Sequence, residues 1–325
     1  MRSADFQDDP PAPGELPAET AAPANAPIEP AILKALLYSD LFDYPLTIAE
    51  IAHFLIGRSG SEAEVETALR SSAWLSARIA AREGFFTLPG RESLVDRRRR
   101  CRRASKILWR KARFYAEILS RFPFIRMVAV TGALAMDNCK VGDDVDLLLA
   151  TAPSRVWLAR GLAVLVVHAG RFSPNTLCPN YVISEQALSL GPRTIYVAHE
   201  FAQMVPLYGR EIHAKMLAAN PWILELLPNA LRPLRVRPEV TAGWMARRFK
   251  AALERPFSGR MGDRVEAWEM RRKIRKFTKE LGPPGSGVIL DRHQVKGHFD
   301  DHGALVSARF HERLEEWRLS APCRD

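Results

Sequence analysis

The chain has 325 residues, a formal net charge of +10 and 47% hydrophobic residues, enough for two domains or for one large domain with appendages. Its longest uninterrupted apolar stretch, Leu162 to Val167, is far too short to cross a membrane, and the chain does not open with a basic and apolar signal. The four cysteines lie far apart without a CxxC pair, so neither a zinc cage nor a disulfide framework is expected. We expect a cytoplasmic protein without a membrane segment.

The charge is unevenly distributed along the chain. Residues 1–30 hold six acidic residues against one arginine, and the total of +10 less this −5 leaves +15 for residues 31–325. The first segment is rich in proline and alanine and cannot bury a core, so we expect a disordered acidic tail. The basic remainder favours phosphate-bearing partners such as nucleotides, RNA or DNA.

Residues 31–90 have the pattern of three short helices followed by a hairpin. Two capping boxes predict where the second and third helices begin: Thr47 with Glu50, and Ser61 with Glu64. The alternating stretch from Ile79 to Leu88, interrupted by Gly84, predicts a β-hairpin. The order resembles that of a winged-helix domain.

Residues 91–122 are predicted to form one long helix with an apolar stripe and a strongly basic first half. Such a run of charges is compatible with a solvated linker helix and equally with a nucleic-acid contact. The residues proposed for a contact with RNA or DNA are Arg98, Arg99, Arg102 and Arg103.

Beyond Pro123 the pattern becomes mixed. Short β-prone runs at Met127–Val130, Val145–Ala150 and Tyr181–Ser184 alternate with helical segments, and the remainder is mainly helical. The predicted fold class is α+β, with a core over residues 123–210 that contains a short mixed sheet. A helical C-terminal region over residues 211–325 is expected to close over the cleft.

The residues that indicate chemistry lie between the first two of these strands. Asp144 and Asp146 stand at i and i+2 of a strand, so both point to one face and can hold one or two hard divalent cations. Gly132 permits close backbone approach, and the amides of a helix that starts there can meet phosphate oxygens. The simpler alternative for the aspartates is a capped turn that leads into an ordinary core strand.

The run Thr131-Gly132-Ala133, a ten-residue gap and Asp144-Val145-Asp146-Leu147 resemble the signature of the nucleotidyltransferase superfamily that includes DNA polymerase beta. The segment Leu41–Thr47 and the order of winged helix, basic helix and core are similar to a bacterial family of predicted nucleotidyltransferases.

The resemblance implies transfer of a nucleoside monophosphate from a nucleoside triphosphate to an acceptor hydroxyl, with release of pyrophosphate. Asp144 and Asp146 would be catalytic ligands of Mg²⁺ or Mn²⁺, and Gly132 and Ala133 would face the triphosphate. The superfamily's third carboxylate has no secure match. Asn180 and Glu185 flank the candidate strand, and Glu185 is the better chemical choice.

The sequence departs from the signature at two places. Ala133 stands where a serine hydroxyl often helps to bind phosphate, and Lys140 is a candidate replacement donor. Asp137 and Asn138 occupy a place where similar sequences favour a turn that contains glycine. These departures, with the basic helix, support a rival hypothesis: a non-catalytic nucleic-acid-binding regulator that retains the fold.

Histidines elsewhere do not match a zinc site. His199-Glu200 lies on an amphipathic helix without a second histidine four residues later, and the histidines after Asp291 match no zinc spacing. We interpret them as structural or surface residues, although Lys296-Gly297-His298 could contact a phosphate.

Overall fold

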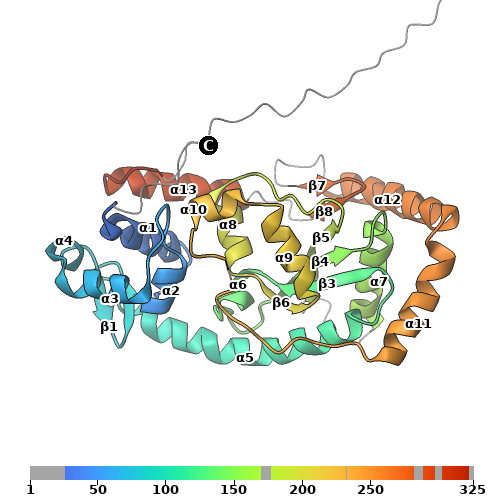
Figure 1. The fold of residues 1–325 in the computed structure, drawn as a ribbon, viewed down its shortest axis with the longest axis horizontal. Helices are drawn as coiled ribbons and strands as arrows, with labels where there is room; N and C mark the ends of the chain where they lie inside the picture. The colour runs from blue at the N-terminus through green and yellow to red at the C-terminus, as the bar shows by residue number, and fades with distance from the viewer. Residues whose placement is uncertain (1–25, 170–176, 232, 282–287, 297–301, 322–325) are drawn as a thin grey trace, which may run out of the picture.

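The N-terminal part of the computed structural model combines four helices with a two-stranded antiparallel sheet (Figure 1). The structure describes residues 26–169, 177–231, 233–281, 288–296 and 302–321, so most of the predicted tail lies outside them. The elements are α1 (Ile28–Asp40), α2 (Ile48–His53), α3 (Glu62–Ser71), α4 (Ala73–Ser76), β1 (Ala80–Arg82) and β2 (Phe85–Thr87). Both predicted capping boxes form, at Thr47 and at Ser61. The hairpin predicted after α3 is confirmed as β1 and β2.

A long helix, α5 (Leu94–Leu119), connects this part to the central sheet. It runs along one side of the molecule beneath the sheet in Figure 1. No glycine or proline interrupts its 26 residues, and its apolar stripe is buried through Leu108, Tyr115 and Leu119.

The central sheet is mixed and has six strands in the order β6-β3-β4-β5-β8-β7. Neighbouring strands are antiparallel except for β4 and β5, which are parallel. The strands are β3 (Ile125–Val130), β4 (Val145–Thr151), β5 (Leu177–Ser184), β6 (Val205–Tyr208), β7 (Ile289–Leu290) and β8 (Gln294–Lys296). The α+β class is thus confirmed.

Helices cover both faces of the sheet. Besides α5, the helices that pack on it include α6 (Gly132–Ala135), α7 (Val156–Ala169), α8 (Ile195–Ala202) and α9 (Arg210–Ala218). Around these lie α10 (Trp222–Leu226), α11 (Trp244–Glu254), α12 (Arg260–Leu281) and α13 (His302–Glu316). Alternate residues of β4 enter two hydrophobic cores: Leu147 and Leu149 pack with α5 and α7, whereas Leu148 and Ala150 pack with α8 and the N-terminal part. No helix in these described ranges is long and apolar enough to span a bilayer.

The region predicted to be helical over residues 211–325 also contributes strands to the sheet. Strands β7 and β8 come from the region predicted to be helical, and they complete the sheet; each is too short for its alternation to be visible in the sequence. The N-terminal part shares one hydrophobic core with α8, α9, α10 and α13, so its apolar face is buried against the rest of the chain.

Candidate functional site

The glycine turn after β3 lies directly against Asp146. The backbone N–H of Thr131 donates to the carbonyl oxygen of Asp146 at 3.1 Å, and Gly132 has a φ of 62°. A Cβ added to Gly132 would lie 2.7 Å from Oδ2 of Asp146, closer than real Cβ contacts allow. The conformation therefore favours glycine at this position, and any Cβ there would displace the Asp146 carboxylate.

Strand β4 presents Asp146 to the face of the sheet that α8 covers. In the parallel pairing with β5, Asp146 lies opposite Cys178. Two residues further along β5, the Asn180 side-chain amide donates a hydrogen bond to Oδ1 of Asp146. This bond fixes the orientation of the carboxylate and leaves Oδ2 turned toward Gly132.

Asp144 precedes β4 and is exposed, while the turn that leads to it is closed by Asp143, whose carboxylate accepts the backbone N–H of Lys140 at 2.7 Å. Partial burial and the neighbouring charge of Asp143 raise the pKa of Asp144. Burial is the main cause that raises the pKa of the Cys178 thiol, and the charges of Asp146 and Asp144 raise it further. Both carboxylates therefore lie near that side chain. Asp144 is not among the described residues that line the cavity beside Asp146, so the joint metal site of the two aspartates stays a prediction.

A third carboxylate, that of Glu200, comes from α8. Burial, with the nearby charge of Asp146, raises the pKa of Glu200 to about 7, and Lys296 acts in the opposite direction. The side-chain amide of Gln203 donates a hydrogen bond to the Glu200 carboxylate, and the nearby backbone N–H of Gly132 acts to lower the pKa of Glu200. The amide that is expected to meet a phosphate therefore lies near a carboxylate in this structure.

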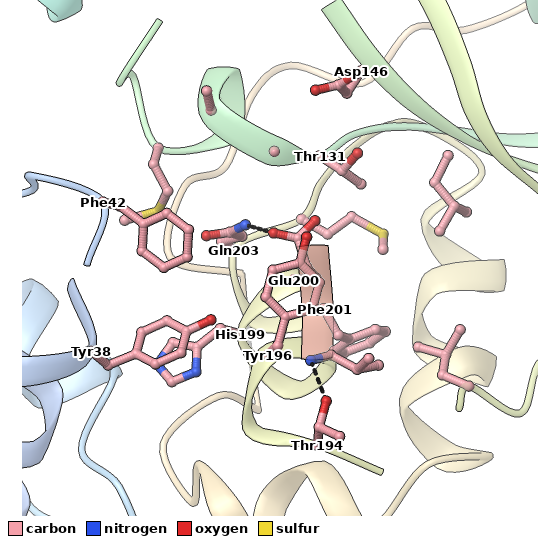
Figure 2. A pocket seen from close by; sticks show the side chains of 18 of the residues that line it. Tyr38, Phe42, Thr131, Asp146, Thr194, Tyr196, His199, Glu200, Phe201 and Gln203 are labelled. Atoms are coloured by element: carbon pink, nitrogen blue, oxygen red, sulfur yellow. Dashed lines mark hydrogen bonds between the residues drawn. The ribbon is translucent and has the colours of Figure 1, made fainter. Parts of the chain in front are cut away.

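Gly132, Asp146 and Glu200 line a cavity of about 870 Å³ between α1, α6, α8, β5 and β8. Figure 2 shows Glu200 between two parts of it. We call the part with Thr131, Gly132, Asp146, Asn180, Glu200 and Lys296 the polar end. We call the part with Tyr38, Phe42, Phe54 and His199 the aromatic end.

The ring of His199 packs against two other rings of the aromatic end. Its imidazole stacks on Tyr38 with 3.6 Å between ring centroids and lies 5.5 Å from the ring of Phe54. Nδ1 lies 2.9 Å from the carbonyl oxygen of Ile195, and burial lowers the pKa of His199 to about 3. The ring is therefore neutral, with Nδ1 as the donor, and Nε2 has no hydrogen-bond partner among the described residues.

Glu185 does not belong to this site, and the assignment of the third carboxylate to it is wrong. Its backbone N–H donates to the carbonyl oxygen of Thr151 at 2.9 Å, beyond the opposite end of the parallel strands from Asp146. At the usual rise per strand residue this separates it from Asp146 by roughly 20 Å. Its carboxylate lies 4.0 Å from the guanidinium of Arg126 instead.

Of the other residues predicted to contact the nucleotide, some line the cavity and one does not. Ala133 lines the cavity with Gly132. Lys140 is exposed and is not among the described lining residues, whereas Lys296 on β8 lines the polar end. Gly297 and His298, considered with Lys296 as phosphate contacts, lie outside the described residues.

The unusual turn after α6 has a structural explanation. Asp137 adopts a φ of 55°, and its carboxylate accepts the indole N–H of Trp109 at 2.6 Å and pairs with Arg235 at 3.4 Å. Asn138 donates its side-chain amide to the carbonyl oxygen of Phe42 at 3.1 Å. The side chains thus stabilise a conformation that glycine would adopt without help.

The basic helix is only partly available for nucleic acid. Arg98 is buried and bonded to Glu50, which contradicts its predicted role as a surface contact. Arg99 donates to Glu83 of the hairpin. Arg102 and Arg103 are exposed on α5.

Comparison of the chain with protein-family models, with curated proteins and with solved structures finds no match in any of the three. In the described part of the chain, no group of three or more His, Cys, Asp or Glu side chains is arranged to hold a metal ion by itself.

Sequence reasoning missed Glu200, His199 and the involvement of Asn180 with Asp146. The pattern placed His199-Glu200 on an amphipathic helix but assigned that pair no function. The sequence does contain one signal for this site: His199 and Glu200 are adjacent polar residues on α8, a helix of eight residues that is otherwise mostly apolar. A carboxylate buried on such a helix needs hydrogen-bond or charge partners nearby.

Proposed function

We propose that the chain is a metal-dependent nucleotidyltransferase that moves a nucleoside monophosphate from a nucleoside triphosphate to an acceptor hydroxyl. The observation that carries the proposal is the contact between the Gly132 turn and the Asp146 carboxylate at one end of a large cavity. The turn allows a phosphate chain to approach the backbone, and the carboxylate is the ligand type that a phosphate-bound cation requires.

Asp144 and Asp146 would hold Mg²⁺ or Mn²⁺. Magnesium in nucleotide sites is commonly bound by one or two carboxylates and completed by substrate phosphates and water, so two aspartates without a third protein ligand fit the group. When bound, the metal would neutralise phosphate charge and favour the ionised form of the attacking hydroxyl.

The protein's own residues have separate tasks in this proposal. Asn180 holds one oxygen of Asp146, and Lys296 supplies positive charge at the polar end. The acceptor oxygen bonds to the α-phosphorus, the bond from that phosphorus to the bridging oxygen breaks, and pyrophosphate leaves. Glu200, with a pKa near 7, is suited to take the proton of the acceptor hydroxyl on a carboxylate oxygen, and it replaces Glu185 as the third carboxylate in this proposal.

The rival hypothesis, a non-catalytic nucleic-acid-binding regulator, is weakened because Arg98 is buried and Arg99 is paired. The exposed Arg102 and Arg103 are what remain to support it.

The test of the proposal is incubation of the full chain with each labelled triphosphate and Mg²⁺ or Mn²⁺, followed by mass spectrometry of protein, RNA and extract metabolites. The expected result is a labelled acceptor with wild type and none with Asp146→Asn. Asp96→Asn on α5 is the matched control, because Asp96 is outside the cavity and its removal costs only a surface ion pair. Labelling by Asp146→Asn equal to that by wild type would refute the proposal.

A further inference from the structure

The charged groups of the cavity are gathered at one end. Among the described lining residues, the carboxylic acids and the one lysine are Asp146, Glu200 and Lys296, all at the polar end. The aromatic end presents Tyr38, Phe42 and the uncharged His199. An anionic group placed there would lose its hydration and find no cation to replace it, which makes its burial costly.

Glu200 separates the two ends. Gln203 holds its carboxylate, and Figure 2 shows Glu200 between Thr131 and Asp146 on one side and Tyr38 and His199 on the other. A nucleotide whose base entered the aromatic end would have to bring its phosphates toward this carboxylate, and like charges repel. At the Gly132 turn, Lys296 and a metal ion at Asp146 would offset the repulsion from Glu200, so we assign the triphosphate to the polar end and the aromatic end to the second reactant.

The aromatic end also contains a hydrogen-bond acceptor without a partner. His199 is only 4% exposed, its ring lines the cavity, and its buried Nε2 has no hydrogen-bond partner among the described residues. A buried polar atom without a partner costs free energy, which a ligand donor would recover if a small shift of the ring brought Nε2 to the cavity. The stacked rings of Tyr38 and His199 add a flat surface suited to an aromatic or apolar body.

We propose that the aromatic end binds the acceptor, and that the acceptor is a small uncharged molecule with an aromatic or apolar body and its reactive hydroxyl at Glu200. This inference rests on the proposed function, because the acceptor role requires transfer at Asp146. It excludes nucleic-acid ends and charged protein segments as acceptors.

The experiment uses 2-phenylethanol as the uncharged probe and phenylacetate as the same ring with a negative charge. Binding to the full chain is measured by saturation-transfer NMR titration. We expect 2-phenylethanol to bind in about the millimolar range and phenylacetate to bind about tenfold more weakly or not at all. Equal binding of the two probes, or no binding of 2-phenylethanol, would overturn the inference.

Substitutions of Phe42, which is half-buried in the cavity wall, test whether the probe binds at the aromatic end. Phe42→Asp should abolish 2-phenylethanol binding, and the milder Phe42→Asn should weaken it, whereas Phe249→Asp, at an exposed phenylalanine of α11, should leave it unchanged. Retention of probe binding by a folded Phe42→Asp would overturn the inference.

Thermal stabilisation by magnesium and triphosphate is measured on the same variants. We expect Phe42→Asp to retain the shift of wild type. Loss of the shift in Phe42→Asp alone would show that the aromatic end holds the nucleobase and would overturn the acceptor assignment. Probe binding by a wild type that shows no triphosphate shift would refute the proposed function, and the acceptor role with it.

Discussion

The guanidinium of Arg98 meets the carboxylate of Glu50 in a buried two-point ion pair, with nitrogen to oxygen distances of 2.7 and 2.8 Å. Arg235 approaches the same carboxylate at 3.0 Å, and the Tyr44 hydroxyl donates to it at 2.8 Å. These residues join α2, α5 and the segment before α11. Because Arg235 also donates to the carbonyl oxygen of Ala135 at 3.1 Å, the network reaches the helix of the glycine turn.

The first prediction concerns acid stability. Burial alone would raise the pKa of Glu50, but Arg98 and Arg235 outweigh it and lower the pKa from 4.5 to about 2. A carboxyl whose pKa is lower in the folded state contributes stability above pH 4.5 and loses it as the pH falls toward 2. Between pH 5.5 and 3, wild type should lose about 2 kcal/mol more of its free energy of unfolding than Glu50→Gln. Urea unfolding at the two pH values measures this, and equal losses in both proteins would contradict it.

The second prediction separates buried from exposed arginines on α5. Arg98→Ala removes one of the two arginines that pair with the buried Glu50 carboxylate and leaves Arg235 alone to compensate its charge. We therefore expect a loss of about 3–5 kcal/mol in the free energy of unfolding. Arg102→Ala, four residues further along the same helix, should change it by less than about 0.5 kcal/mol. Chemical denaturation at neutral pH compares them, and similar values for the two variants would show that the Arg98 pair does not stabilise the fold.

The third prediction concerns the glycine turn. Gly132→Ala would strain a positive φ and bring its Cβ against Asp146, whereas Gly90→Ala has a φ of 80° to strain and no atom within 4 Å. The strain alone costs about 1–2 kcal/mol, so Gly90→Ala should lose about that much stability, and Gly132→Ala should lose at least as much because of the added contact with Asp146. Only Gly132→Ala should also lose stabilisation by magnesium and triphosphate. If both variants retain that stabilisation, the Gly132 turn does not position the phosphates.

The fourth prediction distinguishes the two glutamates considered for the site. Glu200→Gln removes the carboxylate beside Gly132, so turnover should collapse while triphosphate binding survives. Glu185→Gln is the matched control, because Glu185 lies at the far end of β5 beside Arg126 and should be fully active. The labelling assay with both variants tests this, and the reverse pattern would restore Glu185 as the third carboxylate.

Local sequence signals predicted much of the fold but little of the site beyond Gly132 and Asp146. Capping boxes at Thr47 and Ser61 and the glycine turn act over a few residues, so the sequence shows them directly. Glu200 reaches Asp146 only through the packing of α8 on the sheet, which no spacing in the sequence records.

The role of Arg98 could have been inferred from periodicity. Val95, Arg98 and Cys101 recur every three residues on the buried stripe of α5, so the arginine lies on the apolar face. The dense positive charge around it favoured a surface interpretation. The acid that neutralises it, Glu50, lies in another helix, and only the fold brings the two together.

The central claim is that Asp146 holds a metal-bound triphosphate, and thermal unfolding with each triphosphate in the presence and absence of Mg²⁺ tests it most directly. Wild type should gain melting temperature only when metal and triphosphate are both present, because a ligand that binds the folded state stabilises it. Asp146→Asn keeps an oxygen for the Asn180 bond and removes a charge near Glu200, so its melting temperature without ligand should be equal or slightly higher. With metal and triphosphate that variant should show no gain. A wild type without any metal-dependent gain, or an equal gain in Asp146→Asn, would contradict the claim.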